Sequence, residues 1–179
     1  PFLEYSNHQY KAMKNAYAGH LKYSFQLRPH TVADQAYIGA YQGIGVGYFN
    51  FGNPEELGNP LAVYLFQGGR IAQFSPRISL NYEWNFGASF GWKPYDEYDN
   101  PENQIIGSKV NAYLNVNLYL KWALSPKFDL MIGTTGSHFS NGNTQYPNSG
   151  LNTVDCKVGL VYNFNRRADE LAQSWQRPI

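Results

Sequence analysis

Apolar and polar residues alternate along long stretches of this chain. Between residues 77 and 92 every even position is apolar or aromatic, and every odd position is polar or glycine. Residues 110–122 largely repeat the pattern. Because successive side chains of a strand point to opposite faces, both stretches predict β-strands with one apolar and one polar face. They are roughly twice as long as a usual strand of a soluble protein.

Similar alternation predicts seven strands in all, at 19–28, 37–51, 61–68, 77–92, 109–122, 128–140 and 152–164. Pro29 ends the first strand because proline cannot donate to a ladder, and Gly68-Gly69 is expected to close the third. The glycine-rich run 37–51 is not followed by the Lys-Ser/Thr of a nucleotide-binding loop, so its glycines indicate kinks in a curved sheet. Residues 1–18 have no clean period and could form a short helix, a loop or a remnant strand.

Long alternation is typical of a β-barrel, and two kinds of barrel fit. A lipocalin-like soluble barrel would turn the apolar face inward, whereas a membrane barrel would turn it outward. The connection between residues 92 and 109 is long and polar, and the next one, 125–127, is very short. Alternating long and short loops are typical of outer-membrane barrels. We therefore expect an all-β, antiparallel, up-and-down transmembrane barrel of about eight strands.

The whole chain fits a single domain. Its 179 residues divide into an irregular segment or remnant strand at 1–18, the barrel at 19–164 and a polar tail at 165–179. Bacterial single-chain barrels have an even number of strands, so the eighth strand either lies within 1–18 or is missing. Because the chain opens at Pro1 without a signal peptide, we expect a mature or trimmed product.

Composition excludes several other functions. Charged residues make up 15% of the chain and its net charge is +1, so nothing suggests nucleic-acid binding. No apolar run reaches the roughly 18 residues that a transmembrane helix needs. Cys156 is the single cysteine and forms no internal disulfide. The four histidines lack the spacing of metal ligands, and we expect neither a metal nor a cofactor.

The candidate chemistry lies between residues 134 and 152. His138 and Ser140 are two residues apart, so on a strand they share a face. This places a base beside a hydroxyl nucleophile, the pairing that nucleophilic catalysis requires. The His-x-Ser spacing alone is common and would not distinguish an enzyme.

A larger pattern surrounds the pair, made of small, amide and proline residues that lead into the last strand: His138-Phe139-Ser140-Asn141, Pro147-Asn148 and Gly150. It resembles the signature of the outer-membrane lipid A 3-O-deacylase (PagL) family. The resemblance implies an eight-stranded barrel esterase that removes an acyl chain from lipid A with a Ser-His-Glu triad. Ser140 would then be the nucleophile, His138 the base and Asn148 a contributor to the oxyanion hole. Asn152 stands where the family has its glutamate.

The resemblance also implies lipid A of lipopolysaccharide as the partner and the bacterial outer membrane as the location. The first hypothesis is an ester hydrolase with a Ser/His mechanism, in which amide donors near Asn141 or Asn148 stabilise the oxyanion. The second is a catalytically inactive relative that binds lipid A or serves as a structural barrel. A soluble ligand-binding barrel is the third.

The even residue numbers of the candidate triad place it on the apolar face of the strands. His138, Ser140 and Asn152 are all even, as are the apolar residues of the last two strands. We therefore expect the three side chains to face membrane lipid, at the outer leaflet if 125–127 is periplasmic. The odd-numbered charged residues are expected to fill the lumen as paired charges: Arg77, Glu83, Lys121 and Asp129.

Overall fold

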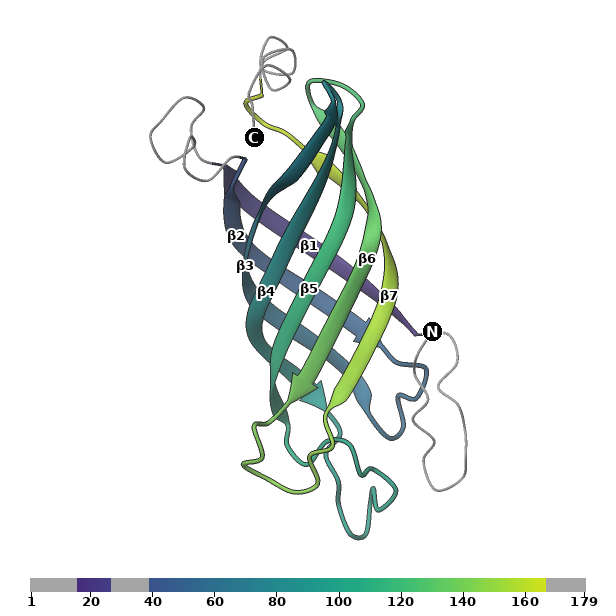
Figure 1. Cartoon of the computed structure of the whole chain (residues 1–179). Helices are drawn as coiled ribbons and strands as arrows, with labels where there is room; N and C mark the ends of the chain where they lie inside the picture. The colour runs from purple at the N-terminus through teal and green to yellow at the C-terminus, as the bar shows by residue number, and fades with distance from the viewer. Residues whose placement is uncertain (1–15, 27–38, 167–179) are drawn as a thin grey trace.

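The computed structural model describes residues 16–26 and 39–166, which form one curled antiparallel sheet of seven strands. Each strand pairs with the next along the chain, so the order in the sheet is the order in the sequence (Figure 1). The strands are β1 Tyr17–Gln26, β2 Tyr41–Asn50, β3 Gly58–Ser75, β4 Ile78–Trp92, β5 Val110–Ala123, β6 Phe128–Ser140 and β7 Leu151–Tyr162. The all-β, up-and-down architecture is confirmed. The expected place of the eighth strand lies almost wholly outside the described residues.

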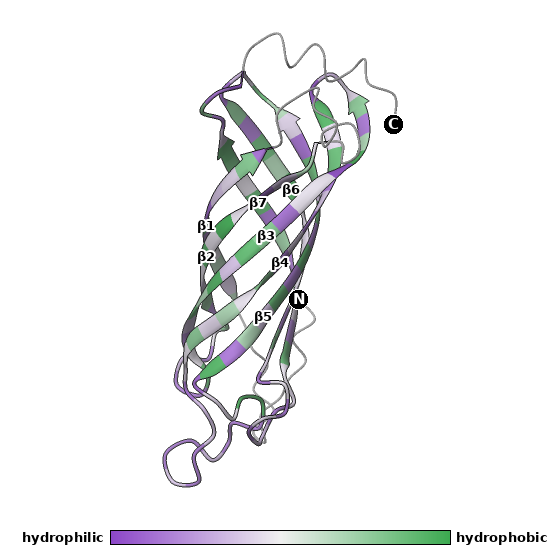
Figure 2. Cartoon of the chain, turned by 90° about the vertical axis from the view of Figure 1, so that its left-hand side faces the viewer, coloured by the Kyte–Doolittle hydropathy of each residue, from purple (hydrophilic) through white to green (hydrophobic). Residues whose placement is uncertain are grey.

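The apolar faces of the strands point outward and the polar faces point inward. On β4, for example, the side chain of Phe86 is 56% exposed, whereas Glu83 is only 2% exposed. Figure 2 shows hydrophobic and hydrophilic residues alternating along the strands. An outer surface built from apolar side chains is the arrangement of a membrane barrel and the reverse of a soluble one. No helix in the described part of the chain is long and apolar enough to cross a membrane.

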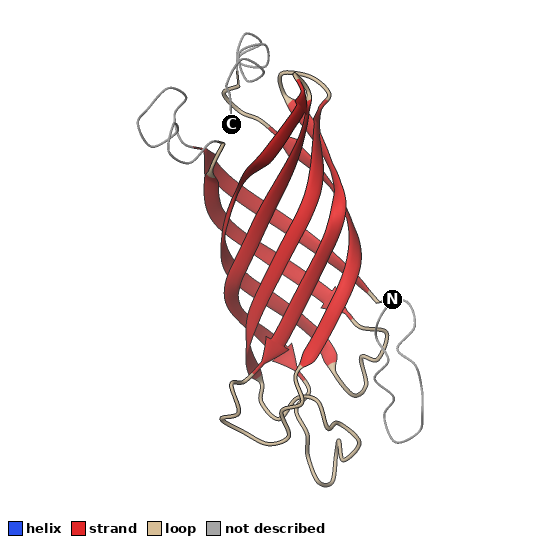
Figure 3. Cartoon of the chain, in the orientation of Figure 1, coloured by secondary structure: helices blue, strands red, loops and turns tan. Residues whose placement is uncertain are grey.

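Of the connections that the structure describes in full, the long ones lie at one end of the barrel and the short ones at the other (Figure 3). The connections 51–57, 93–109 and 141–150 lie at one end, which we call the long-loop end. The turns 76–77 and 124–127 lie at the other, the short-turn end. The predicted long connection at 92–109 and the predicted short one at 125–127 are confirmed and lie at opposite ends, as is typical of an outer-membrane barrel.

An aromatic cluster fills the barrel at the long-loop end. Phe139 is fully buried, and its ring centroid lies 5.0 Å from that of Phe49 and 5.1 Å from that of Tyr113. Apolar residues from the long connections are buried in the same cluster: Phe51, Leu57, Ile105 and Ile106. The long loops are therefore packed onto the barrel as a cap.

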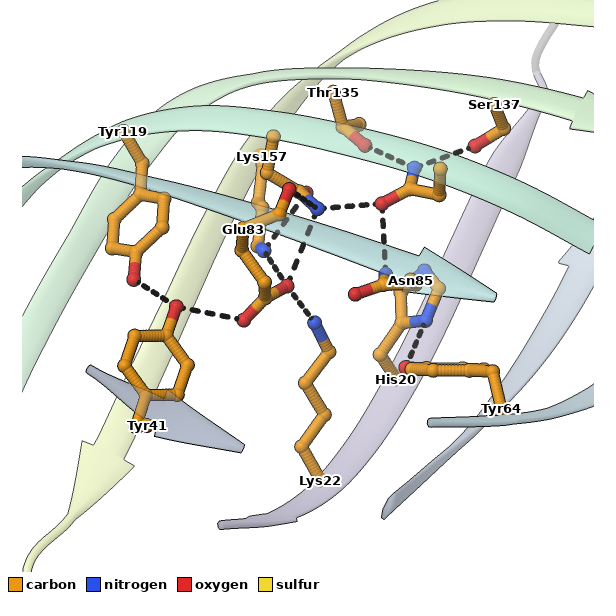
Figure 4. A network of polar contacts seen from close by, with 12 residues as sticks. His20, Lys22, Tyr41, Tyr64, Glu83, Asn85, Tyr119, Thr135, Ser137 and Lys157 are labelled. Carbon is orange, nitrogen blue, oxygen red and sulfur yellow. Dashed lines mark hydrogen bonds and ion pairs between the residues drawn. The ribbon is translucent and has the colours of Figure 1, made fainter. Parts of the chain in front are cut away.

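A polar network centred on Glu83 fills the middle of the barrel (Figure 4). Glu83 on β4 forms ion pairs with Lys22 of β1 and with Lys157 of β7, the latter at 3.4 Å. Its carboxylate also accepts hydrogen bonds from the Tyr41 hydroxyl at 3.0 Å and the Asn117 amide at 3.2 Å. Side chains from β1, β2, β5 and β7 thus meet at one carboxylate of β4.

The prediction of paired charges in the lumen is confirmed for the two acidic residues but not for their partners. Glu83 is paired as described above, and Asp129 forms an ion pair with Arg166 at 2.7 Å. Arg77 is exposed in the turn after β3, so its expected place in the lumen was wrong. Lys121 forms no ion pair with any carboxylate of the described residues.

The prediction that Gly68-Gly69 closes the third strand was also wrong, because β3 continues to Ser75. A Cβ atom on Gly68 would lie 2.3 Å from the hydroxyl oxygen of Tyr41, so this glycine makes room for an inward tyrosine. Gly45 likewise leaves room for Tyr64, whose ring would lie 2.5 Å from an added Cβ. These glycines mark close approach inside the lumen.

Candidate active site

The pairing of β6 with β7 brings the predicted site residues together. His138 lies opposite Asn152 in the register of these two strands. Phe139 points inward into the aromatic cap, so its neighbours His138 and Ser140 point outward. The inward anchor and the outward pair therefore follow from the same three residues of β6.

The three side chains form a continuous hydrogen-bonded chain. His138 Nδ1 lies 2.8 Å from Asn152 Oδ1, and His138 Nε2 lies 3.0 Å from Ser140 Oγ. An amide oxygen can only accept, so Nδ1 carries the proton and donates it to Asn152. Nε2 is then left as the acceptor for the Ser140 hydroxyl. This protonation pattern suits a histidine that removes a proton from a serine nucleophile.

The three hydrogen-bonded side chains lie on the lipid-facing side of the barrel, where β6 and β7 reach the long-loop end. Asn152 is exposed, and His138 and Ser140 are partly buried. The neighbouring outward positions are apolar, with Leu114 opposite His138 on β5 and Val154 two residues beyond Asn152 on β7. Such a place gives a membrane lipid direct access to the serine.

Gly150 leads the chain back into β7 directly beside the imidazole. Its φ angle is +71°, a left-handed conformation that residues with a Cβ rarely adopt. An added Cβ would lie 3.2 Å from His138 Cε1 and 3.3 Å from the carbonyl oxygen of Phe139. Both the backbone conformation and the close approach require glycine here.

Asn141 and Asn148 tie the ends of loop 141–150 together. The Asn141 backbone N–H donates to Asn148 Oδ1 at 3.1 Å, and Asn141 Nδ2 donates to the Gln145 carbonyl at 2.7 Å. The Asn141 N–H and the Asn148 oxygen are therefore already engaged. Of the groups predicted to stabilise an oxyanion, the Asn148 Nδ2 is left as a donor.

The long connection 93–109 supports loop 141–150 from behind. A Cβ atom on Gly107 would lie 2.6 Å from the carbonyl oxygen of Tyr146, so the two backbones are in close contact. Ser149 Oγ donates to the Gln104 carbonyl at 3.0 Å. These contacts fix the loop that follows the serine.

Asn103 organises this supporting connection, a role that no pattern in the sequence indicated. It is fully buried, and its Nδ2 donates to the carbonyls of Glu56 and Lys93 at 3.2 and 2.7 Å. Its Oδ1 accepts from the N–H groups of Ile105 and Ile106, both at 3.0 Å. A single asparagine in a polar loop carries no periodic signal, so the pattern of the sequence could not reveal this role.

The described residues contain no group of three or more histidine, cysteine or acidic side chains that could hold a metal ion. The chemistry that the site can perform on its own is attack by a serine hydroxyl on a carbonyl carbon, with histidine as the base.

Comparison with known families gives a match that covers the candidate site. The model of the family described as lipid A 3-O-deacylase (PagL) matches residues 66–161, more than half of the chain. The matched region begins within β3 and ends within β7, and it includes His138, Ser140, Asn148 and Asn152. No curated protein and no solved structure matches the chain.

Proposed function

The chain belongs to the lipid A 3-O-deacylase (PagL) family, and from this premise we propose that it is an esterase of the bacterial outer membrane that removes an ester-linked acyl chain from lipid A. The observation that carries the proposal is the hydrogen-bonded chain Asn152–His138–Ser140 on the lipid-facing surface. Lipid A lies in the outer leaflet, so the long-loop end would face the cell exterior.

The reaction would proceed in two steps. In the first, His138 Nε2 takes the hydroxyl proton as Ser140 Oγ attacks the ester carbonyl carbon. The tetrahedral intermediate collapses, the proton passes to the sugar oxygen, and the acyl group stays on Ser140. In the second step, water gives a proton to His138 and attacks the acyl group, which leaves as a fatty acid and restores the serine.

The oxyanion that forms in each step needs a hydrogen-bond donor. Asn148 is the candidate, acting through its Nδ2, because its Oδ1 already accepts the Asn141 N–H. In this proposal Asn141 acts indirectly, since its backbone and side chain hold the loop that carries Asn148. Removal of one such donor typically lowers the rate by about 10²–10³-fold.

Asn152 sets the expected rate. Its oxygen can hold the histidine tautomer, but a neutral amide cannot offset the positive charge that His138 gains. Replacement of the triad acid by an amide lowers the rate of a serine protease about 10⁴-fold, whereas Cys-His-Asn triads are active. We therefore expect a slow esterase. The same residue favours the second candidate function, an inactive relative that binds lipid A or serves as a structural barrel.

Mass spectrometry of lipid A tests the proposal. Lipid A would be extracted from cells that express the parent chain or its Ser140→Ala variant. Loss of one acyl group with the parent alone would support a serine esterase. Heat-dependent migration in gels of the isolated outer-membrane fraction would establish that both proteins are folded there. If lipid A stays intact in both strains with folded barrels, the esterase is excluded and the inactive relative becomes the better account.

A further inference from the structure

Tyr146 is an exposed aromatic residue in the loop that follows the nucleophile. Its side chain is 78% exposed and lies beyond the ends of β6 and β7, within loop 141–150. No hydrogen bond or ring contact with another described residue engages its side chain. A large apolar ring in this position contributes little to the packing of the barrel.

The backbone of Tyr146 is nevertheless held in place near Ser140. The preceding carbonyl, that of Gln145, accepts a hydrogen bond from Asn141, the residue next to Ser140. The carbonyl of Tyr146 itself packs against Gly107 of the supporting connection. A tyrosine has two side-chain torsions, so a ring on a fixed backbone loses little conformational entropy when it binds a ligand.

The chemistry of the substrate dictates what lies near this ring. In a 3-O-acylated lipid A the ester oxygen is bonded directly to a carbon of a glucosamine ring. When Ser140 attacks the ester, the acyl chain extends into the hydrocarbon layer that surrounds the strands. The sugar must then lie on the opposite side of the serine, toward loop 141–150. The C–H face of a pyranose is apolar and can pack against an aromatic ring.

We propose that Tyr146 forms a sugar subsite of the candidate active site and packs against the glucosamine ring that carries the scissile ester. The inference rests on the proposed function and adds to it a residue that recognises the leaving group. Tyr146 would determine the preference for a sugar ester over a simple ester of the same fatty acid.

A second account treats Tyr146 as an interfacial anchor, since tyrosine is common where barrels meet the membrane surface. The two accounts differ in what they affect. An anchor stabilises the barrel in the membrane and treats all ligands alike, whereas a sugar contact affects only ligands that contain the sugar. Binding of lipid A itself therefore separates them.

The test measures binding of purified lipid A to the full chain in detergent micelles, with Ser140→Ala as the background so that no turnover occurs. We expect the additional change Tyr146→Ala to weaken binding about tenfold, the effect of losing one aromatic contact. Tyr146→Trp should retain binding. Tyr98→Ala is the matched control, because Tyr98 is 88% exposed on the connection 93–109.

Equal affinity with and without the Tyr146 ring would overturn the inference, as would an equal loss from Tyr98→Ala. The parent and Tyr146→Ala chains, with Ser140 intact, would also be assayed on a p-nitrophenyl ester and on lipid A. A rise in KM for lipid A alone supports the sugar subsite. If the parent hydrolyses neither compound but the Tyr146 ring still governs lipid A binding, the esterase proposal fails and the subsite stands.

Discussion

At the scale of single residues, the bond from His138 to Asn152 determines how the candidate site can work. The amide oxygen accepts the Nδ1 proton at 2.8 Å and so leaves Nε2 free for Ser140. It supplies orientation without charge. As His138 becomes protonated, nothing at position 152 compensates for the positive charge that develops.

Asn152→Glu tests this division between orientation and charge. Asn152 is exposed, so a longer side chain has room. We expect the rate of ester hydrolysis to rise by roughly tenfold to 10⁴-fold, because a carboxylate stabilises the imidazolium. Asn152→Gln is the control, since it adds the same length without charge and should give no gain. A glutamate variant that is folded but no faster would show that charge at this position does not limit the rate.

Gly150→Ala tests the close approach beneath the imidazole. The left-handed φ of +71° should reduce the free energy of unfolding by about 1–2 kcal/mol. The added Cβ would also press on His138 Cε1 at 3.2 Å and displace the ring, so hydrolysis should fall as well. Urea unfolding in lipid vesicles and an ester assay measure the two effects.

Gly142→Ala is the matched control for that variant. Gly142 also has a left-handed φ, +64°, but an added Cβ would meet no atom within 4 Å. It should lose similar stability while the folded protein keeps its activity. Equal loss of activity in both variants would show that loop strain, and not contact with the imidazole, is responsible.

At the scale of elements, β6 both fills the barrel and presents the site. Phe139 packs in the aromatic cap while its two neighbours face the lipid. Phe139→Ala should reduce the free energy of unfolding by about 3–5 kcal/mol, because it leaves a cavity. Because β6 would then be held less firmly, the protein that does fold should also hydrolyse the ester more slowly.

Phe86→Ala provides the comparison for that change. Phe86 is 56% exposed on the outer face of β4, where lipid chains can fill the space of the lost ring. Phe86→Ala should reduce the free energy of unfolding only by the transfer free energy of the lost ring, without the cost of a cavity, and should leave hydrolysis unchanged. An equal effect of the two substitutions on unfolding and on activity would contradict a role of the cap in holding β6.

The elements also show which features a single sequence reveals. Strict alternation predicted the strands at 77–92 and 110–122 to within one residue of β4 and β5, because one face is apolar throughout. The extension of β3 beyond Gly68 was missed, since that glycine makes room for Tyr41 of the neighbouring strand and does not end β3, which goes on pairing with β4. The even numbers of the three site residues also predicted that their side chains share one face.

The contacts within the site depend on information that local patterns do not contain. Opposition of His138 and Asn152 requires the register of β6 and β7, which the loop between them sets. The bonds of Asn103 join segments that lie far apart in the sequence. Neither can be read from periodicity, because both are determined by which distant residues become neighbours.

At the scale of the whole molecule, Glu83 connects strands that the backbone ladder does not. Among the described strands, β1 and β7 are the two edges of the sheet. Lys22 from β1 and Lys157 from β7 both bind the Glu83 carboxylate. The pair of edges is thereby drawn toward one point in the lumen, which favours a closed, curled sheet.

Glu83→Gln should therefore weaken the whole barrel. It leaves two partly buried lysines without a carboxylate, and removal of one partner from a fully buried ion pair usually costs about 3–5 kcal/mol, which is an upper limit here. Lys157→Gln should cost less, because Glu83 keeps its ion pair with Lys22. Unfolding by urea in lipid vesicles would rank the two variants.

Glu83→Gln should change the stability of the barrel but not the chemistry of the candidate site. No hydrogen bond joins Glu83 to His138, Ser140 or Asn152, so the folded fraction of Glu83→Gln should keep its activity per molecule. Equal destabilisation by Lys157→Gln and Glu83→Gln would show that the remaining Lys22–Glu83 ion pair contributes nothing to stability. Loss of activity in a fully folded Glu83→Gln barrel would instead mean that the lumen controls the site through β5 and β6, which Asn115 links by a hydrogen bond to Ser137 at 2.8 Å.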